Sequence, residues 1–163
     1  MADAITRILV PVDFSPHSDH ALQYAATLAG KVGAAVRLLH VVEDTLLTNA
    51  FTGEAYVALP QELLPAIVEQ AGKRLVSLKD RVFPHGADVQ TKVVLGRPSH
   101  SIVEQATDGA FDLIVMGTHG RSGFSHMFMG SVAERVVRTS PCAVLTVRGP
   151  GAAAAPGAAP KAA

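Results

Sequence analysis

The chain has 163 residues with 14 acidic and 14 basic side chains, so its formal net charge is zero. This length predicts one compact domain. The absence of a Lys/Arg cluster in the sequence disfavours nucleic-acid binding through a basic face. The single cysteine, Cys142, excludes an internal disulfide and is typical of a reducing compartment.

Two further absences in the sequence bear on location. No apolar run approaches the length of a membrane span, and the first residues lack the pattern of a secretory signal. We therefore expect a cytoplasmic protein with no membrane partner. Residues 149–163 contain only Gly, Ala, Pro and one Lys, with no large apolar group to bury. We expect a domain over residues 1–148 and a disordered tail over 149–163.

The first half of the chain predicts two strands and two helices. The β-branched run over residues 5–12 predicts a strand buried on both faces. Ser15 and Pro16 are typical of an N-cap and a first helical residue, and Gly33 of a C-cap. Residues 35–42 predict a second strand, and residues 61–82 a second helix that tolerates Pro65 only near its first turn. Residues 43–59 show no clean periodicity, which is typical of a lid, a binding loop or disorder.

The second half continues the alternation. Apolar patterns predict strands over residues 88–95, 112–116 and 142–147, and helices over residues 98–108 and 130–139. Strands that alternate with helices predict a five-stranded parallel sheet covered on both faces, so we expect a three-layer α/β/α fold, flavodoxin-like or adenine-nucleotide α-hydrolase-like. Ligands of such sheets bind at the carboxyl ends of the strands. The loops carrying Asp13, Glu43, Arg97 and the glycines described next are expected to meet at that edge.

The spacing Gly117-x2-Gly120-x9-Gly130-Ser131 lies between a predicted strand and a predicted helix. Glycines there let the backbone approach phosphate oxygens, and the first turn of the helix offers unpaired N–H groups. The Ser131 hydroxyl can donate one more hydrogen bond. The alternative is that these are ordinary turn glycines. The Walker sequence and the G-x-G-x-x-G fingerprint are both absent, so neither a P-loop nor a dinucleotide site is supported.

Charged residues near these glycines have two interpretations each. A carboxylate at Asp13 could accept from ribose hydroxyls or coordinate magnesium beside phosphates. It could equally support the dipole of the following helix. Arg97 and Arg121 could pair with phosphates or be solvated.

The histidines and the cysteine suggest no catalytic site. We expect His119 and His126 to be exposed without a special role, and His17 and His20 to form a surface pair rather than a metal site. His40, in a strand, is expected to be packed. A buried structural thiol is favoured over a nucleophile at Cys142, because no base can be assigned to it. The apolar residues 127–129 could cover the glycine loop or contact a partner.

Together these motifs resemble the universal stress protein family. The resemblance is carried by residues 11–15 (PVDFS), 39–41 (LHV), 116–121 (MGTHGR), 130–134 (GSVAE) and 140–145 (SPCAVL), and it covers about residues 5–148. It implies a parallel sheet in the order 3-2-1-4-5, usually a homodimer, and a place in the ATP-binding subgroup that carries these glycines.

The resemblance also implies a set of site residues. Pro11, Val12 and Asp13 would line the ribose and adenine side, and Val41 would contact adenine through its backbone. The residues around the ribose and phosphates would be Met116, Gly117, Gly120, Arg121, Gly130, Ser131 and Val132.

Three functions follow as hypotheses. The first is an ATP-binding stress-response regulator whose nucleotide occupancy orders residues 117–131 and changes what a protein partner contacts. Magnesium or an arginine must then balance the triphosphate, because a helix end offers only about half a positive charge. The second is a slow ATPase, for which Asp13, His119 and Ser122 could orient water but form no recognised catalytic arrangement. The third is a nucleotide-free interaction module with dimerisation as its main property. Whichever of these functions holds, we expect the apolar edge Val144–Val147 to pair with the same strand of a second copy and give a homodimer.

Overall fold

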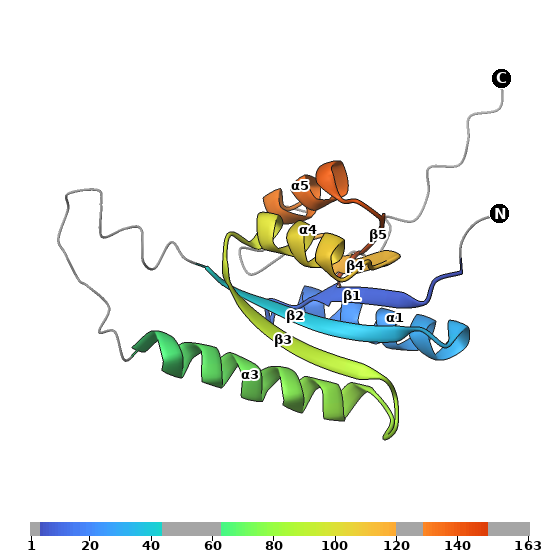
Figure 1. Cartoon of the computed structure of the whole chain (residues 1–163), viewed down its shortest axis with the longest axis horizontal. Coiled ribbons are helices and arrows are strands. Elements are labelled where there is room, and N and C mark those ends of the chain that lie inside the picture. Colours follow the sequence, from blue (N-terminus) through green and yellow to red (C-terminus); the bar gives the residue numbers. More distant parts are fainter. Residues whose placement is uncertain (1–3, 44–62, 120–128, 150–163) are drawn as a thin grey trace, which may run out of the picture.

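The computed structural model describes residues 4–43, 63–119 and 129–149. Its centre is a five-stranded sheet in the order β3-β2-β1-β4-β5, in which every neighbouring pair is parallel (Figure 1). The strands are β1 (Arg7–Pro11), β2 (Ala35–Glu43), β3 (Val89–Gly96), β4 (Leu113–Gly117) and β5 (Ala143–Val147). The predicted fold class and strand order are confirmed.

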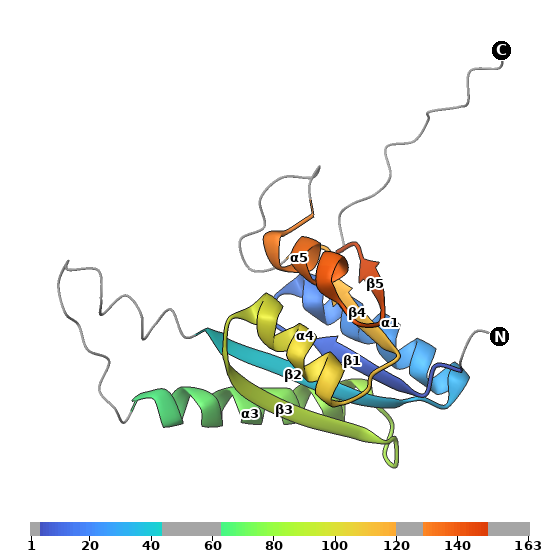
Figure 2. The same ribbon diagram turned by 45° about the horizontal axis from the view of Figure 1, so that its top comes forward.

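Helices cover both faces of this sheet (Figure 2). One face packs against α1 (Pro16–Val32) and α3 (Leu63–Val82). The other packs against α4 (Pro98–Asp108) and α5 (Ser131–Thr139). Labels follow Figure 1. The predicted alternation of strands and helices is confirmed over the described residues, with ends that differ from the prediction by one or two residues.

The central strand β1 shows why its sequence is continuously apolar. Ile8 and Val10 are fully buried and belong to the core beneath α1 and α3. Leu9, also fully buried, points to the opposite core beneath α4 and α5. Because successive side chains of a strand point to opposite faces, a strand covered on both faces needs apolar residues at consecutive positions, as at Ile8, Leu9 and Val10, whereas Arg7 at its start is exposed. The prediction of a strand buried on both faces is thus confirmed.

The residues predicted to cap the two ends of α1 do so. The Ser15 hydroxyl accepts a hydrogen bond from the Ser18 N–H at 3.2 Å. Gly33 takes the left-handed conformation, with φ 71° and ψ 28°, and donates its N–H to the Ala29 carbonyl. In α3, Pro65 is the third helical residue, where no intrahelical N–H bond is lost.

Strand β5 ends one side of the sheet, so the edge expected at Val144–Val147 is present. Within the described ranges, no helix is long and apolar enough to cross a membrane. Residues 1–3, 44–62, 120–128 and 150–163 lie outside the described part of the chain. The predictions for the tail, for the irregular stretch after Glu43, for His126 and for residues 127–128 fall there.

Candidate functional site

A pocket of about 580 Å³ opens at the carboxyl ends of β1, β2 and β4. Its volume is in the range of about 300–1,000 Å³ typical of small-molecule sites. In the order β3-β2-β1-β4-β5, the chain proceeds from β1 to one side of the sheet and later returns to the other side with β4. The pocket lies at this reversal, which is where open α/β sheets bind their ligands.

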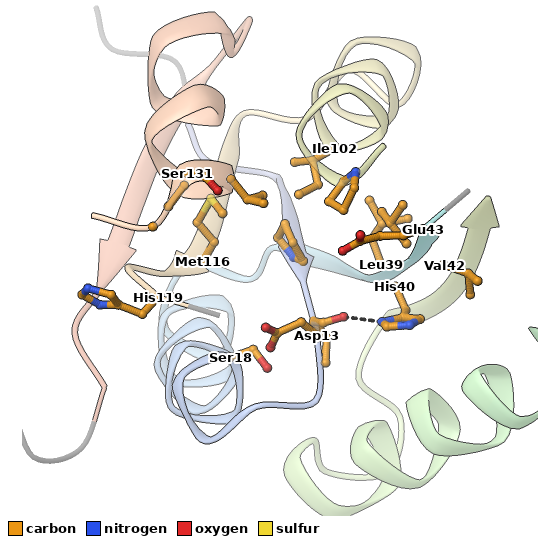
Figure 3. Close-up of a pocket in the computed structure, with 18 of the residues that line it drawn as sticks. Asp13, Ser18, Leu39, His40, Val42, Glu43, Ile102, Met116, His119 and Ser131 are labelled. Carbon is orange, nitrogen blue, oxygen red and sulfur yellow. Dashed lines mark hydrogen bonds between the residues drawn. The ribbon is translucent and has the colours of Figure 1, made fainter. Parts of the chain in front are cut away.

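Two groups of side chains lie on opposite sides of the pocket (Figure 3). Asp13 and Ser18 lie together next to α1, whereas Ile102, Met116 and Ser131 lie across the pocket, towards α4 and α5. The complete lining is Pro11, Val12, Asp13, Ser18, Leu39, His40, Val41, Val42, Glu43, Ile67, Pro98, Ile102, Met116, Gly117, Thr118, His119, Gly130, Ser131, Val132 and Ala133.

The end of β1 is tied to β2 at two points beside the pocket. The Val12 N–H donates to the Leu39 carbonyl at 2.8 Å, and His40 Nδ1 lies 2.7 Å from the Val12 carbonyl oxygen, the dashed line in Figure 3. Since a carbonyl oxygen only accepts, Nδ1 carries the proton in this bond. His40 is 5% exposed, so the prediction that it is packed is confirmed. These bonds fix the backbone immediately before Asp13.

Asp13 combines a local structural bond with a position at the pocket. Its Oδ1 accepts from the Ser15 N–H at 3.0 Å, a short side-chain-to-backbone turn that leads the chain into α1. The residue is half-buried, and it lines the pocket. Both interpretations considered for this carboxylate, support of the helix start and contact with a ligand, are therefore compatible with its placement.

The amino end of α5 presents backbone donors to the pocket. Gly130 is the N-cap, in an extended conformation, and its own N–H donates to the Thr118 carbonyl at 2.8 Å. Ser131, Val132 and Ala133 follow as the first three helical residues, and all line the pocket. No side chain caps this helix, and no described residue accepts a hydrogen bond from these three N–H groups. Such a helix end attracts an anion through its donors and its dipole.

Close backbone contacts leave little space for a side chain at Gly117. A Cβ added there would lie 3.1 Å from the His17 carbonyl oxygen and 3.2 Å from that of His119. Backbone atoms on both sides cannot rotate away as a side chain could. The close approach of α1 to the end of β4 therefore favours a glycine at this position, since a Cβ would need the neighbouring backbone to shift by a few tenths of an ångström.

Nine of the eleven residues predicted for the site surround this one pocket: Pro11, Val12, Asp13, Val41, Met116, Gly117, Gly130, Ser131 and Val132. Gly120 and Arg121 lie outside the described residues. Arg97 is exposed at the N-cap of α4 and is not part of the lining.

Other lining residues were not predicted. Ile67 and Ile102 come from α3 and α4, where they were expected only as members of an apolar face. Helical periodicity identifies such a face but cannot tell which of its residues extends over the sheet edge. Leu39 and His40 could have been inferred, because they precede Val41 on the same strand.

Two expectations need correction. His119 is half-buried rather than exposed, with Nδ1 3.0 Å from the Thr118 hydroxyl and its ring centroid 5.8 Å from that of His17. It is covered because β5 and α1 flank the turn after β4. Cys142 is half-buried rather than buried, since it lies at the start of the edge strand β5. In the part of the chain that the structure describes, neither His17 nor His20 belongs to a cluster of three or more His, Cys, Asp or Glu side chains that could hold an ion.

The fold and the pocket define a class: an open, doubly wound α/β domain with a small-molecule-sized pocket at its topological switch point. Similarity to known proteins narrows that class to one family. The model of the universal stress protein family matches residues 4–148, and the chain belongs to this family.

Sequence similarity to relatives extends over nearly the whole domain. The chain is 33% identical over 147 residues to universal stress protein YxiE of Bacillus subtilis, covering 87% of this chain and 98% of that one. It is 30% identical over 152 residues to universal stress protein MJ0577 of Methanocaldococcus jannaschii, covering 87% and 94%.

Solved structures have the same architecture. A structure of MJ0577 matches with a TM-score of 0.76 and 29% identity, covering 90% of this chain and 97% of that one. A universal stress protein solved in complex with cAMP matches with a TM-score of 0.60 and 25% identity, covering 90% and 99%.

Proposed function

We propose that this protein binds an adenine nucleotide, with ATP as its ligand, in the pocket at the switch point. The observation that carries the proposal is the amino end of α5, where the N–H groups of Ser131, Val132 and Ala133 meet the pocket without a described acceptor. A phosphate chain supplies the charge and the acceptors that such an end attracts. The 25% identical relative solved in complex with cAMP supports the choice of an adenine nucleotide.

The base and the ribose are assigned to the walls formed by β1 and β2. Leu39, Val41 and Ile102 provide apolar contacts suited to a flat base. The carboxylate of Asp13 is placed to accept from ribose hydroxyls, and Pro11 and Val12 complete this side. On the phosphate side the proposal retains Met116, Gly117, Gly130, Ser131 and Val132, together with Gly120 and Arg121, which lie outside the described residues.

Magnesium fits this arrangement as a companion of the phosphates. The ion is usually held by one or two carboxylates plus phosphate oxygens and water. Asp13 and Glu43 both line the pocket, whereas the described residues hold no cluster of three or more ligands for a metal of their own. In this arrangement Asp13 would hold the ion instead of accepting from the ribose hydroxyls, and the ion would balance the negative charge of the triphosphate.

A regulatory role is the function we assign to this binding. Occupancy would hold residues 117–131 in one arrangement through the helix end and so change the surface that a protein partner contacts. Pairing of β5 with the same strand of a second copy would cover its open edge and give a symmetric homodimer. No residue is assigned a catalytic role, and a slow ATPase remains the alternative.

Mass spectrometry of the gently purified protein tests the proposal. Co-purified ATP is the expected result, AMP or ADP would favour hydrolysis, and no nucleotide would favour a plain interaction module. Calorimetric titration with ATP, and with GTP as the matched control, then measures the preference for adenine. Equal affinity for the two nucleotides, or no binding of either, would contradict the assignment.

A further inference from the structure

The residue that follows Asp13 has an unusual backbone. Phe14 has φ +63°, in the left-handed region that L side chains rarely adopt. In the described part of the chain, Ala110 is the other non-glycine residue with a positive φ. For a bulky aromatic residue this conformation is costly, and it persists only where surrounding contacts hold it. The turn that presents Asp13 to the pocket therefore depends on what holds Phe14.

Two side chains from other elements hold this ring. The Arg74 guanidinium carbon, from α3, lies 3.9 Å from the centroid of the Phe14 ring. The His40 ring, from β2, lies with its centroid 4.4 Å away at an interplanar angle of 39°. A cation over an aromatic face is attracted by the ring quadrupole, and tilted ring pairs at this separation are also favourable. Phe14 thus joins α3, β2 and the β1–α1 turn.

The same contacts bracket Asp13 in sequence. On one side Val12 is bonded to Leu39 and His40, and on the other side Phe14 is held by His40 and Arg74. Neither Phe14 nor Arg74 lines the pocket. Phe14 can therefore influence a ligand through its own turn, whose ligand-facing residue is Asp13, and through His40, which lines the pocket and contacts the Phe14 ring.

We propose that Phe14 is a positioning residue for the nucleotide: its ring, held by Arg74 and His40, maintains the left-handed turn that places the Asp13 carboxylate in the pocket. This inference rests on the proposed function, because it assigns the turn a role in nucleotide affinity. It predicts that affinity depends on the tolerance of position 14 for a positive φ and on the cation at position 74.

The experiment compares Phe14→Ala with Phe14→Gly by calorimetric titration with ATP, with urea denaturation of each protein. Both variants lose the ring, but only glycine adopts a positive φ without strain. We expect Phe14→Ala to raise the Kd about tenfold and Phe14→Gly to raise it less than about threefold. If the ring served packing alone, both variants would bind alike, and that result would overturn the inference.

Substitutions of the exposed residue Arg74 test the same inference, with a smaller expected change in Kd. Arg74→Met removes the cation from Phe14, and Lys73→Met removes the neighbouring exposed cation, which pairs with Glu69 instead. We expect about a threefold increase in Kd for Arg74→Met, partial rescue by Arg74→Lys and no change for Lys73→Met. Equal affinities of the two methionine variants would count against the inference.

Asp13→Ala shows whether Phe14 acts through the carboxylate. In that background, Phe14→Ala should have no further effect on the Kd, because the group that it positions is gone. Fully additive effects would contradict the proposal. Wild-type protein that binds no adenine nucleotide would overturn the proposed function and this inference together. Wild-type binding with an unaffected Phe14→Ala variant would overturn the inference alone.

Discussion

Gly130→Val tests the assignment of the phosphate site most directly. Gly130 is the N-cap of α5 and lines the pocket immediately before the three N–H donors. Its φ of −62° and ψ of 149° lie in the extended region that valine accepts. The substitution therefore places an isopropyl group beside the donors without forcing the backbone to change.

The size of the effect follows from the donors that the side chain would displace from phosphate. A hydrogen bond to a charged group contributes about 1.5–3 kcal/mol. Loss of two such bonds at the lower value weakens binding by about 3 kcal/mol, which is more than a hundredfold in Kd. The effect on folding is smaller: replacement of an N-cap glycine by valine costs about 1 kcal/mol or less, because Gly130 keeps its N–H bond to Thr118.

The assay is calorimetric titration with ATP, paired with thermal unfolding of each variant. Gly30→Val serves as the control, because a Cβ at Gly30, in the last turn of α1, meets no atom outside its own stretch of helix within 4 Å. The control is expected to bind ATP as the wild type does. Unchanged ATP affinity in folded Gly130→Val would refute the placement of phosphates at the α5 amino end.

Three further predictions concern stability and assembly. Replacement of Leu75, a fully buried residue of α3 that packs in the core between this helix and the sheet, by alanine should lower the free energy of unfolding by about 3 kcal/mol, measured by urea denaturation; a loss below about 1 kcal/mol would contradict its role in the core. Hydrogen bonds from the Thr6 N–H and hydroxyl and from the Arg7 N–H lower the pKa of Asp112. Because its folded pKa lies below its unfolded one, its stabilisation is complete above the ordinary value of 3.8 and is lost as the pH falls through the folded pKa. Asp112→Asn should therefore flatten the acid limb of the stability curve, and an unchanged limb would refute this. Light scattering at micromolar concentration should give twice the chain mass of 17.0 kDa; a monomer would contradict pairing through β5.

Much of the fold could be predicted because its signals are local. The Ser15-Pro16 start and the Gly33 end of α1 depend on side chains within a few residues of each terminus. The continuous apolar run of β1 follows from cover on both faces of the sheet. The pattern predicted a parallel sheet, and the resemblance to a known family supplied its strand order. The local patterns of the sequence do not by themselves specify which strand becomes an edge.

The composition of the pocket could be predicted only in part. The glycines and Asp13 follow strands directly, so the geometry of a parallel sheet brings them to one edge. Ile67 and Ile102 reach the same pocket from helices, and their places depend on how far α3 and α4 extend over the sheet. That extent is a result of packing between distant segments, which periodicity does not encode.

By itself, therefore, the sequence determined the order of elements and the residues that the strand ends bring together. Only the tertiary structure showed why particular residues are favoured at certain positions around the pocket. Gly117 is constrained by the backbone of α1 at His17, and Phe14 keeps a left-handed turn because Arg74 and His40 hold its ring. The physical reason is that backbone approach and ring stacking join residues far apart in the chain, and only the packed fold brings them within contact distance.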